Sequence, residues 1–299
     1  MLSTTEHRKL RLKARIRQNL TAYAFLAPAL IFFVLFLAWP VVALLIQSFQ
    51  TGGIMSPAKY VGLENWRQTF TDPLVVKSIR NTVVYSLMAI PAVFIIAMIL
   101  ALSLNTVRFG QNTFKTIIYY PTLQPILLAA LMFTFVLHQD FGILNIILRA
   151  ITGEPVNFLG NRNLALPTIA MVEVWKGAGF WTLLFLAGIQ SLPRDLYHAA
   201  ELDGAGPGRR FFQLTLPLLK PTFFFSFIFA TIVNLQIFDS VFVLTDGGPV
   251  NATVTTTWYI YRSLFTFNEP GYGATLSFVL VILVLALTAV QTILFRERR

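Results

Sequence analysis

Long apolar stretches alternate with short polar segments along the whole chain. Six of these stretches are long enough to cross the hydrocarbon core of a bilayer, which is about 30 Å thick and takes about 20 helical residues. Because lipid offers no hydrogen-bond partner to a free backbone N–H, spans this apolar are expected to be helices, and the alternation typical of barrel strands is absent. The pattern predicts an all-α polytopic bundle of six transmembrane helices, near residues 20–48, 80–104, 116–137, 165–190, 218–244 and 274–295.

Prolines occur inside several of these stretches. Proline lacks a backbone N–H and breaks helices in soluble proteins, but in a membrane bundle neighbouring helices and waters can satisfy the freed carbonyl groups. We therefore expect kinks, rather than ends of helices, at Pro28, Pro40, Pro91, Pro121 and Pro125.

Charge and composition support a membrane protein and give its orientation. Only 12% of the 299 residues are charged and 56% are hydrophobic, whereas a soluble domain has roughly 25% charged residues. Of the 23 Lys and Arg residues, 15 fall on one side of the predicted membrane and 7 on the other, so the richer side is predicted to be cytoplasmic. The net charge of +10 follows from this topology and gives no reason to expect nucleic acid.

The chain is expected to form one membrane domain with basic ends. The first apolar run continues to Phe49, well beyond the 7 to 15 apolar residues of a signal peptide, so we expect an uncleaved first helix. There is no cysteine, and His7, His138 and His198 are far apart, so no metal site is expected. The predicted parts are a cytoplasmic segment at 1–19, a membrane domain at 20–295 and a cytoplasmic tail at 296–299.

The segment between the fourth and fifth predicted helices, residues 191–217, is too patterned for a simple connector. After Pro193, one side of the segment is apolar and the other acidic, which predicts a short amphipathic helix that Gly204 ends. Arg209 and Arg210 precede two phenylalanines, as suits a chain returning from water through the headgroups. On these residues alone two interpretations stay open, a helix that binds a partner and a helix that only closes the loop.

Three short motifs follow one another in this loop. They are Ala199-Ala200, Asp203-Gly204-Ala205 and Leu214-x-Leu216-Pro217. Their order and spacing closely resemble the Glu-Ala-Ala loop of ABC importer permeases, in which Glu-Ala-Ala precedes a glycine and Ile-x-Leu-Pro follows. His198 stands where that family usually has Glu, and Leu214 where it usually has Ile.

A second set of residues is similar to the same family. Phe238-Asp239, the run from Leu244 through Gly247-Gly248-Pro249, and Gly271-Tyr-Gly-Ala274 look like the outer end of helix five and the following loop in sugar permeases of the maltose and glycerol-3-phosphate type. The resemblance is specific from about residue 171 to residue 274.

This resemblance implies a function in import. The chain would be the membrane-spanning permease subunit of an ATP-driven importer for a sugar or sugar-like solute in a prokaryotic cell membrane, working by alternating access. The expected partners are a second homologous permease, two ATP-binding cassette subunits, an extracytoplasmic solute-binding protein and the lipid bilayer. The residues that the resemblance assigns to coupling with the ATPase are His198, Ala199, Ala200, Glu201, Asp203, Gly204, Ala205, Leu216 and Pro217.

Catalysis is not expected of this chain. It has no Gly-x4-Gly-Lys-Ser/Thr phosphate loop, so partner subunits are expected to bind ATP and Mg, and no cofactor is expected here. The alternative from another class is a self-sufficient secondary carrier of a small polar solute, for which inverted repeats are typical. No clear inverted repeat is present. An intramembrane enzyme would need clustered catalytic groups, and His138 and His198 fall on opposite sides of the predicted membrane.

Polar residues inside the predicted spans are candidates for a solute pathway, because a charge there costs about 2.5 to 3.5 kcal/mol on the insertion scale. Glu173 and Lys176 share a face with Gly177, either as a mutually neutralising pair or as lining for a solute. Gln236, Asp239 and Ser240 are expected on one face of helix five, where hydrogen bonds between helices are the alternative role. The predicted pathway residues are Thr122, Gln124, Glu173, Trp175, Lys176, Gly177, Asn234, Gln236 and Asp239.

Overall fold

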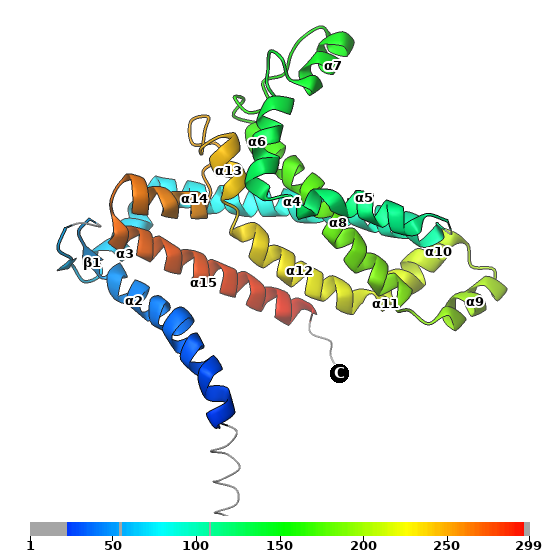
Figure 1. Ribbon diagram of the computed structural model, residues 1–299, viewed down its shortest axis with the longest axis horizontal. Coiled ribbons are helices and arrows are strands. Elements are labelled where there is room, and N and C mark those ends of the chain that lie inside the picture. Colours follow the sequence, from blue (N-terminus) through cyan, green and yellow to red (C-terminus); the bar gives the residue numbers. More distant parts are fainter. Residues whose placement is uncertain (1–22, 54–55, 108, 296–299) are drawn as a thin grey trace, which may run out of the picture.

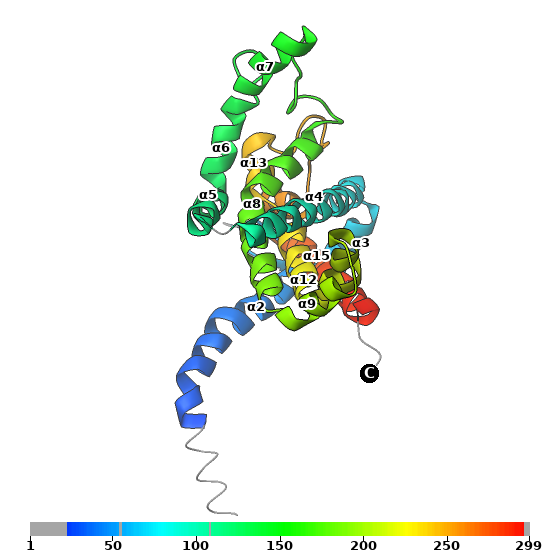
Figure 2. The same cartoon turned by 90° about the vertical axis from the view of Figure 1, so that its right-hand side faces the viewer.

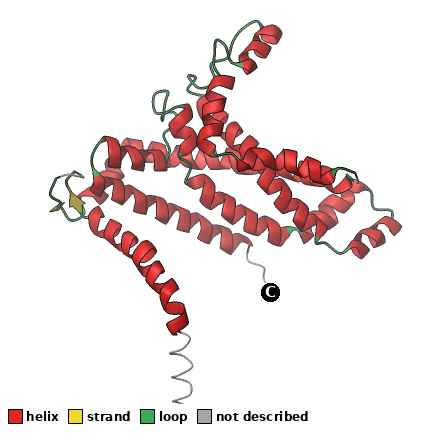
Figure 3. Cartoon of the chain, viewed as in Figure 1, coloured by secondary structure: helices red, strands yellow, loops and turns green. Residues whose placement is uncertain are grey.

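The computed structural model describes residues 23–53, 56–107 and 109–295. Helices make up nearly all of its regular structure (Figure 3). The strands in the described part form one short antiparallel pair, β1 (Gln50–Thr51) with β2 (Lys59–Tyr60). The predicted basic segments at 1–19 and 296–299 lie outside the described residues.

Four described helices are long and apolar enough to cross a membrane. They are Tyr23–Ser48, α4 (Pro73–Thr106), α8 (Ala165–Gln190) and α15 (Pro270–Phe295). Two further candidates are helix pairs bent at a break: α5 (Gln111–Leu123) with α6 (Ile126–Val136) at 92°, and Pro207–Leu218 with α12 (Lys220–Leu235) at 66°. Counting each bent pair as one span gives the six predicted spans.

The third and fifth predicted spans are each interrupted in the structure. Gln124 has ψ 139°, an extended conformation, because the ring of Pro125 disfavours the helical region for the residue before it. In the fifth span, α12 ends at Leu235 and the short helix α13 (Asp239–Leu244) begins after a break of three residues. The effect at Pro125 is therefore a sharp break and not a mild kink.

The first helix stands apart from the remaining helices (Figures 1 and 2). It includes a π-helical turn, η1 (Val34–Ala38), and ends in α2 (Trp39–Ser48), which packs on α15. Phe25 and Trp39 are mostly exposed. Within one chain this helix covers no core, and its apolar surface is free for lipid or another subunit.

Polar contacts join the ends of α4, α14 (Thr256–Tyr261) and α15. These ends lie on the side of the molecule that also holds α3 (Glu64–Thr71) and η3 (Arg262–Thr266). Asp72 caps α4 by accepting a hydrogen bond from the Leu74 N–H (2.8 Å), and its second oxygen accepts from the hydroxyls of Tyr259 and Tyr272. Burial raises the pKa of Asp72, but these hydrogen bonds outweigh burial and keep its pKa below the ordinary value. Three helices are thus joined through one carboxylate.

The core lies where α4, α8 and α12 meet. Phe94 of α4 contacts the rings of Trp181 and Phe185 of α8, at 5.0 and 5.3 Å between centroids. Phe185 packs against the tilted ring of Phe223 of α12 at 4.9 Å. Such aromatic pairs add about 0.5 to 1.5 kcal/mol each beyond their buried area. Phe223 is partly buried and packs against this core.

Helices α5 and α8 approach closely at Gly179. A Cβ atom on Gly179 would lie 2.3 Å from the carbonyl oxygen of Ile118 and 2.8 Å from the Cα of Tyr119. Only a residue without a side chain fits there, as at other close helix contacts in membranes. This contact positions the end of α5, and hence the bend into α6, against α8.

Candidate functional site

A cavity of about 420 Å³ lies between α4, the first residue of α6, α8, α12 and the break before α13. Its walls combine aromatic rings, including Phe180, Trp181 and Phe229, with polar side chains. Six of the nine predicted pathway residues line it: Glu173, Lys176, Gly177, Asn234, Gln236 and Asp239. Segments far apart in the sequence therefore meet at one polar site within the bundle.

The break between α12 and α13 opens this site. Phe238 has φ −136° and ψ −60°, outside the helical region, so Gln236, Asp239 and Ser240 do not share one helical face. The prediction of such a face is wrong for that reason. Ser240 instead donates a hydrogen bond across to the Glu173 carboxylate, which links α13 to α8.

Glu173 and Lys176 are not a tight pair. Among the described residues, no ion pair within 4 Å joins them, and Ser240 is the hydrogen-bond partner of Glu173. Both side chains are half-buried and line the cavity. Since burying an ion costs several kcal/mol unless it is paired and hydrogen-bonded, these groups are placed where a polar ligand or water can solvate them.

Asn234 offers a free acceptor to the cavity region. Its Nδ2 donates to the carbonyl oxygen of Ala230 on its own helix (2.8 Å). The structure gives its Oδ1 no partner within the described residues. Asn234 is partly buried and lines the cavity, so this amide oxygen can accept a hydrogen bond from the hydroxyl or N–H of a ligand.

The remaining three predicted pathway residues lie outside the cavity. Thr122 donates its hydroxyl hydrogen bond to the carbonyl oxygen of Lys176 (2.9 Å) and so ties α5 to α8. Gln124 occupies the break between α5 and α6. Trp175 is 38% exposed and meets Phe133 of α6 edge to face, at 5.1 Å.

The aromatic residues of the cavity wall were not among the predicted pathway residues. Phe180 and Trp181 follow Gly177 by three and four residues, so helical spacing alone puts all three on one face. That spacing was a usable signal. Tyr85 of α4 also lines the cavity, but no pattern in the sequence could place it there.

The patterned loop forms a separate helix, as predicted. Helix α9 (Arg194–Leu202) follows Pro193 and is terminated by Asp203 and Gly204, and Gly204 has φ +74°. The N–H of Gly204 bonds the Glu201 carbonyl (3.0 Å) and the N–H of Ala205 bonds the Ala200 carbonyl (2.9 Å). This is a Schellman ending, for which glycine is favoured because it has no Cβ.

Helix α9 lies fully at the surface. None of its residues is buried, and Leu202 is 90% exposed. Figure 1 shows α9 beyond the ends of α8 and α10 (Pro207–Arg210), at the opposite end of the molecule from α3. The predicted coupling residues from 198 to 205 lie in this helix or directly after it.

Two side-chain contacts hold α9 to the start of the next transmembrane segment. The Glu201 carboxylate accepts a hydrogen bond from Arg210 and lies 3.8 Å from Nδ1 of His198. The hydroxyls of Tyr197 and Thr215 are 2.9 Å apart. Thr215 ends the π-helical turn η2 (Phe211–Thr215), which continues into α11 (Leu216–Leu218). The other two predicted coupling residues, Leu216 and Pro217, lie in α11.

Residues 93–299 match the family described as binding-protein-dependent transport system inner membrane component. The chain belongs to this family. It is a permease subunit of a binding-protein-dependent ABC importer and a multi-pass inner membrane protein, and it is not itself an enzyme. The permease family has no cofactors, and its transport depends on a periplasmic binding protein.

Curated relatives span nearly the whole chain. The chain is 36% identical to the sulfoquinovosyl glycerol transport system permease protein SmoG of Agrobacterium fabrum, covering 94% of this chain and 92% of that protein. It is 33% identical to the lactose transport system permease protein LacF of Rhizobium radiobacter (94% and 96% covered). It is also 33% identical to the trehalose/maltose transport system permease protein MalF of Thermococcus litoralis (96% and 97% covered).

Solved structures match the fold as well. A chain of a bacterial ABC transporter involved in the import of the acidic polysaccharide alginate superposes with a TM-score of 0.83 at 25% identity, covering 96% of this chain and 98% of that one. A chain of the alginate transporter in complex with its alginate pentasaccharide-bound periplasmic protein gives a TM-score of 0.84. The all-α membrane bundle predicted from hydropathy is thereby confirmed.

Proposed function

We propose that this permease forms half of the translocation pathway for a sugar or sugar-like solute, and that the cavity beside Glu173 and Asn234 is its solute site. The observation that carries the proposal is the combination of carboxylate, amide and ammonium groups with the rings of Phe180, Trp181 and Phe229 around one cavity. Sugars present hydroxyl groups together with weakly apolar ring faces, so such walls suit them. Relatives named for lactose and for trehalose and maltose support the same solute class.

The complete importer in this proposal contains a second homologous permease, two ATP-binding cassette subunits and the periplasmic binding protein. Both ends of the chain lie in the cytoplasm, as the distribution of Lys and Arg indicates. The exposed helix α9 then meets an ATPase subunit, and closure of the two ATPases moves α9 together with α12 through the contacts at Arg210 and Thr215. The cavity opens alternately to the two sides.

Removal of the Asn234 amide tests the solute site. Loss of one hydrogen bond costs about 0.5 to 1.5 kcal/mol, which is a factor of about 2 to 12 in affinity. In proteoliposomes holding the assembled importer, Asn234→Ala should raise by this factor the concentration of solute-loaded binding protein that gives half-maximal uptake. The control is Asn105→Ala, at an exposed position of α4 outside the cavity.

A panel of neutral and acidic sugars, presented on the purified binding protein, identifies the solute for this assay. Equal half-maximal concentrations for Asn234→Ala and Asn105→Ala, at unchanged ATPase activity, would show that Asn234 only supports its own helix. The same assay is run with amino acids and short peptides, and transport of one of these in place of every sugar would reject the solute class.

A further inference from the structure

Helix α7 (Ile143–Thr152) has its apolar side turned away from the protein. Four isoleucines at helical spacing, Ile143, Ile146, Ile147 and Ile151, are 51 to 76% exposed, whereas the polar Asn145 on the opposite side is fully buried. A helix packed on a protein surface in water has the reverse arrangement, with apolar residues inward. Something apolar must therefore cover the outer face of α7.

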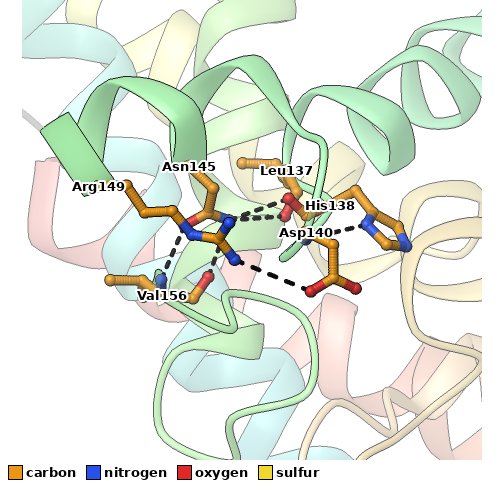
Figure 4. Close-up of polar contacts among 6 residues, drawn as sticks. All are labelled: Leu137, His138, Asp140, Asn145, Arg149 and Val156. Carbon is orange, nitrogen blue, oxygen red and sulfur yellow. Dashed lines mark hydrogen bonds and ion pairs between the residues drawn. The ribbon is translucent and has the colours of Figure 1, made fainter. Parts of the chain in front are cut away.

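The corner between α6 and α7 is fixed by Asn145 (Figure 4). Its Nδ2 donates to the carbonyl oxygens of His138 (3.1 Å) and Val156 (3.0 Å), and its Oδ1 accepts from the Val156 N–H (2.7 Å). Arg149 reaches Asp140 at 3.9 Å on the edge of the same corner. Because all these groups are tied down, the direction in which α7 presents its isoleucines is set by the fold.

This corner also sets the depth of α7 relative to the membrane. Helix α6 is the second part of a bent span, and its exposed side chains include Leu128, Leu131 and Phe135. Polar residues begin directly after it, at His138 and Asp140, and such residues are favoured at the boundary of the hydrocarbon rather than within it. Since Asn145 binds the His138 carbonyl, the first turn of α7 stays within a few ångström of this boundary.

We propose that α7 lies in the membrane interface, with its four isoleucines inserted among lipid acyl chains and Arg149 at headgroup level. Amphipathic helices that lie in an interface bury their apolar face about 5 to 10 Å into the boundary between headgroups and acyl chains. The isoleucine face has no hydrogen-bonding group and no aromatic ring, which suits acyl chains better than a binding protein that must dock and release. Helix α7 then anchors the outer end of α6, and with it the bend beside the cavity, to the bilayer surface.

Spin labels test this placement cleanly, because the chain has no native cysteine. We would label Ile147→Cys in the assembled importer in nanodiscs of phosphatidylethanolamine and phosphatidylglycerol, and measure collision rates with oxygen, which concentrates in lipid, and with a water-soluble nickel chelate. Phe135→Cys in α6 is the reference for lipid, and Glu154→Cys, exposed just after α7, is the reference for water.

The proposal predicts that the ratio of oxygen to nickel collision rates at 147 is several-fold above the ratio at 154 and falls in the range of the ratio at 135. A nickel rate at 147 equal to that at 154 would overturn it, because the face would then contact water. An immobilised label with low rates for both reagents would also overturn it, because the face would then be covered by another protein subunit.

Discussion

Replacement of Gly179 by alanine should weaken the packing of α5 on α8, and Gly177 in the same helix provides a matched control. At 179 the added Cβ would lie 2.3 Å from the Ile118 carbonyl oxygen, whereas at 177 the nearest side-chain atom is 3.8 Å away. Ordinary close C···O contacts are about 3.3 Å or longer, so α5 must move by about 1 Å to accept Gly179→Ala. Overpacking of this kind costs about 1 to 3 kcal/mol.

Both substitutions gain about 1 kcal/mol of helix propensity, since alanine is favoured over glycine in a helix. That gain cancels when the two variants are compared, so their difference reports the steric cost alone. With about 2 °C per kcal/mol for a chain of this size, Gly179→Ala should unfold about 2 to 6 °C below Gly177→Ala. Tryptophan fluorescence of the purified importer in detergent, heated at one fixed rate, measures this difference.

Equal unfolding temperatures for the two variants would refute the close approach of α5 and α8. A lower unfolding temperature for Gly177→Ala would refute it as well, because the wall of the cavity would then be the tighter site.

Three further outcomes follow from the described contacts. The pKa of Asp72 is lowered, so its ionised form stabilises the fold above the ordinary carboxyl pKa, and this stabilisation is lost as pH falls through the lowered value. Asp72→Asn should therefore unfold more easily than the native chain at pH 7 and lose less stability on acidification. Parallel profiles of stability against pH for the two proteins would contradict the hydrogen bonds of Asp72 with Tyr259 and Tyr272. Glu201→Arg should lower uptake per ATP hydrolysed several-fold, and the double variant Glu201→Arg with Arg210→Glu should restore it. If uptake by the double variant stays low, the ion pair between these residues does not orient α9. Gly204→Val should uncouple uptake from ATP hydrolysis, because valine is strained at φ +74°. The control Gly206→Val, at φ −65° and in open space, should remain coupled. Equal uptake per ATP hydrolysed by the two variants would mean that the end of α9 has no part in coupling.

The number of spans could be predicted from hydropathy, because contact with lipid requires a long apolar run in each span. The fourth span, predicted at 165–190, has the same bounds in the structure. The second begins earlier than predicted, at Pro73, because the Asp72 cap lies outside the apolar run. Hydropathy does not predict the breaks between α5 and α6 and between α12 and α13, because it averages over side chains and carries no information on backbone angles. The pair Gln124-Pro125 does indicate a break, because a proline disfavours the helical conformation of the residue before it.

Helix α7 was overlooked for a different reason. Its isoleucines have the 3.6-residue period of a helix, but the segment is too short to span a membrane, so the search for membrane spans does not detect it. For the cavity, helical spacing was enough to bring Glu173, Lys176 and Gly177 together. The hydrogen bond from Ser240 to Glu173 could not be predicted from the sequence, because it depends on the helix break at Phe238 and joins residues 67 positions apart.

Transport by the reconstituted importer tests the central claim most directly. The chain is placed in proteoliposomes with its partner permease and ATPase subunits, and uptake of the radiolabelled sugar that its binding protein recognises is followed with ATP inside. Uptake should require ATP hydrolysis and the binding protein together, and should stop when either is withheld. Uptake by this chain alone, driven by an ion gradient without ATP, would contradict the account.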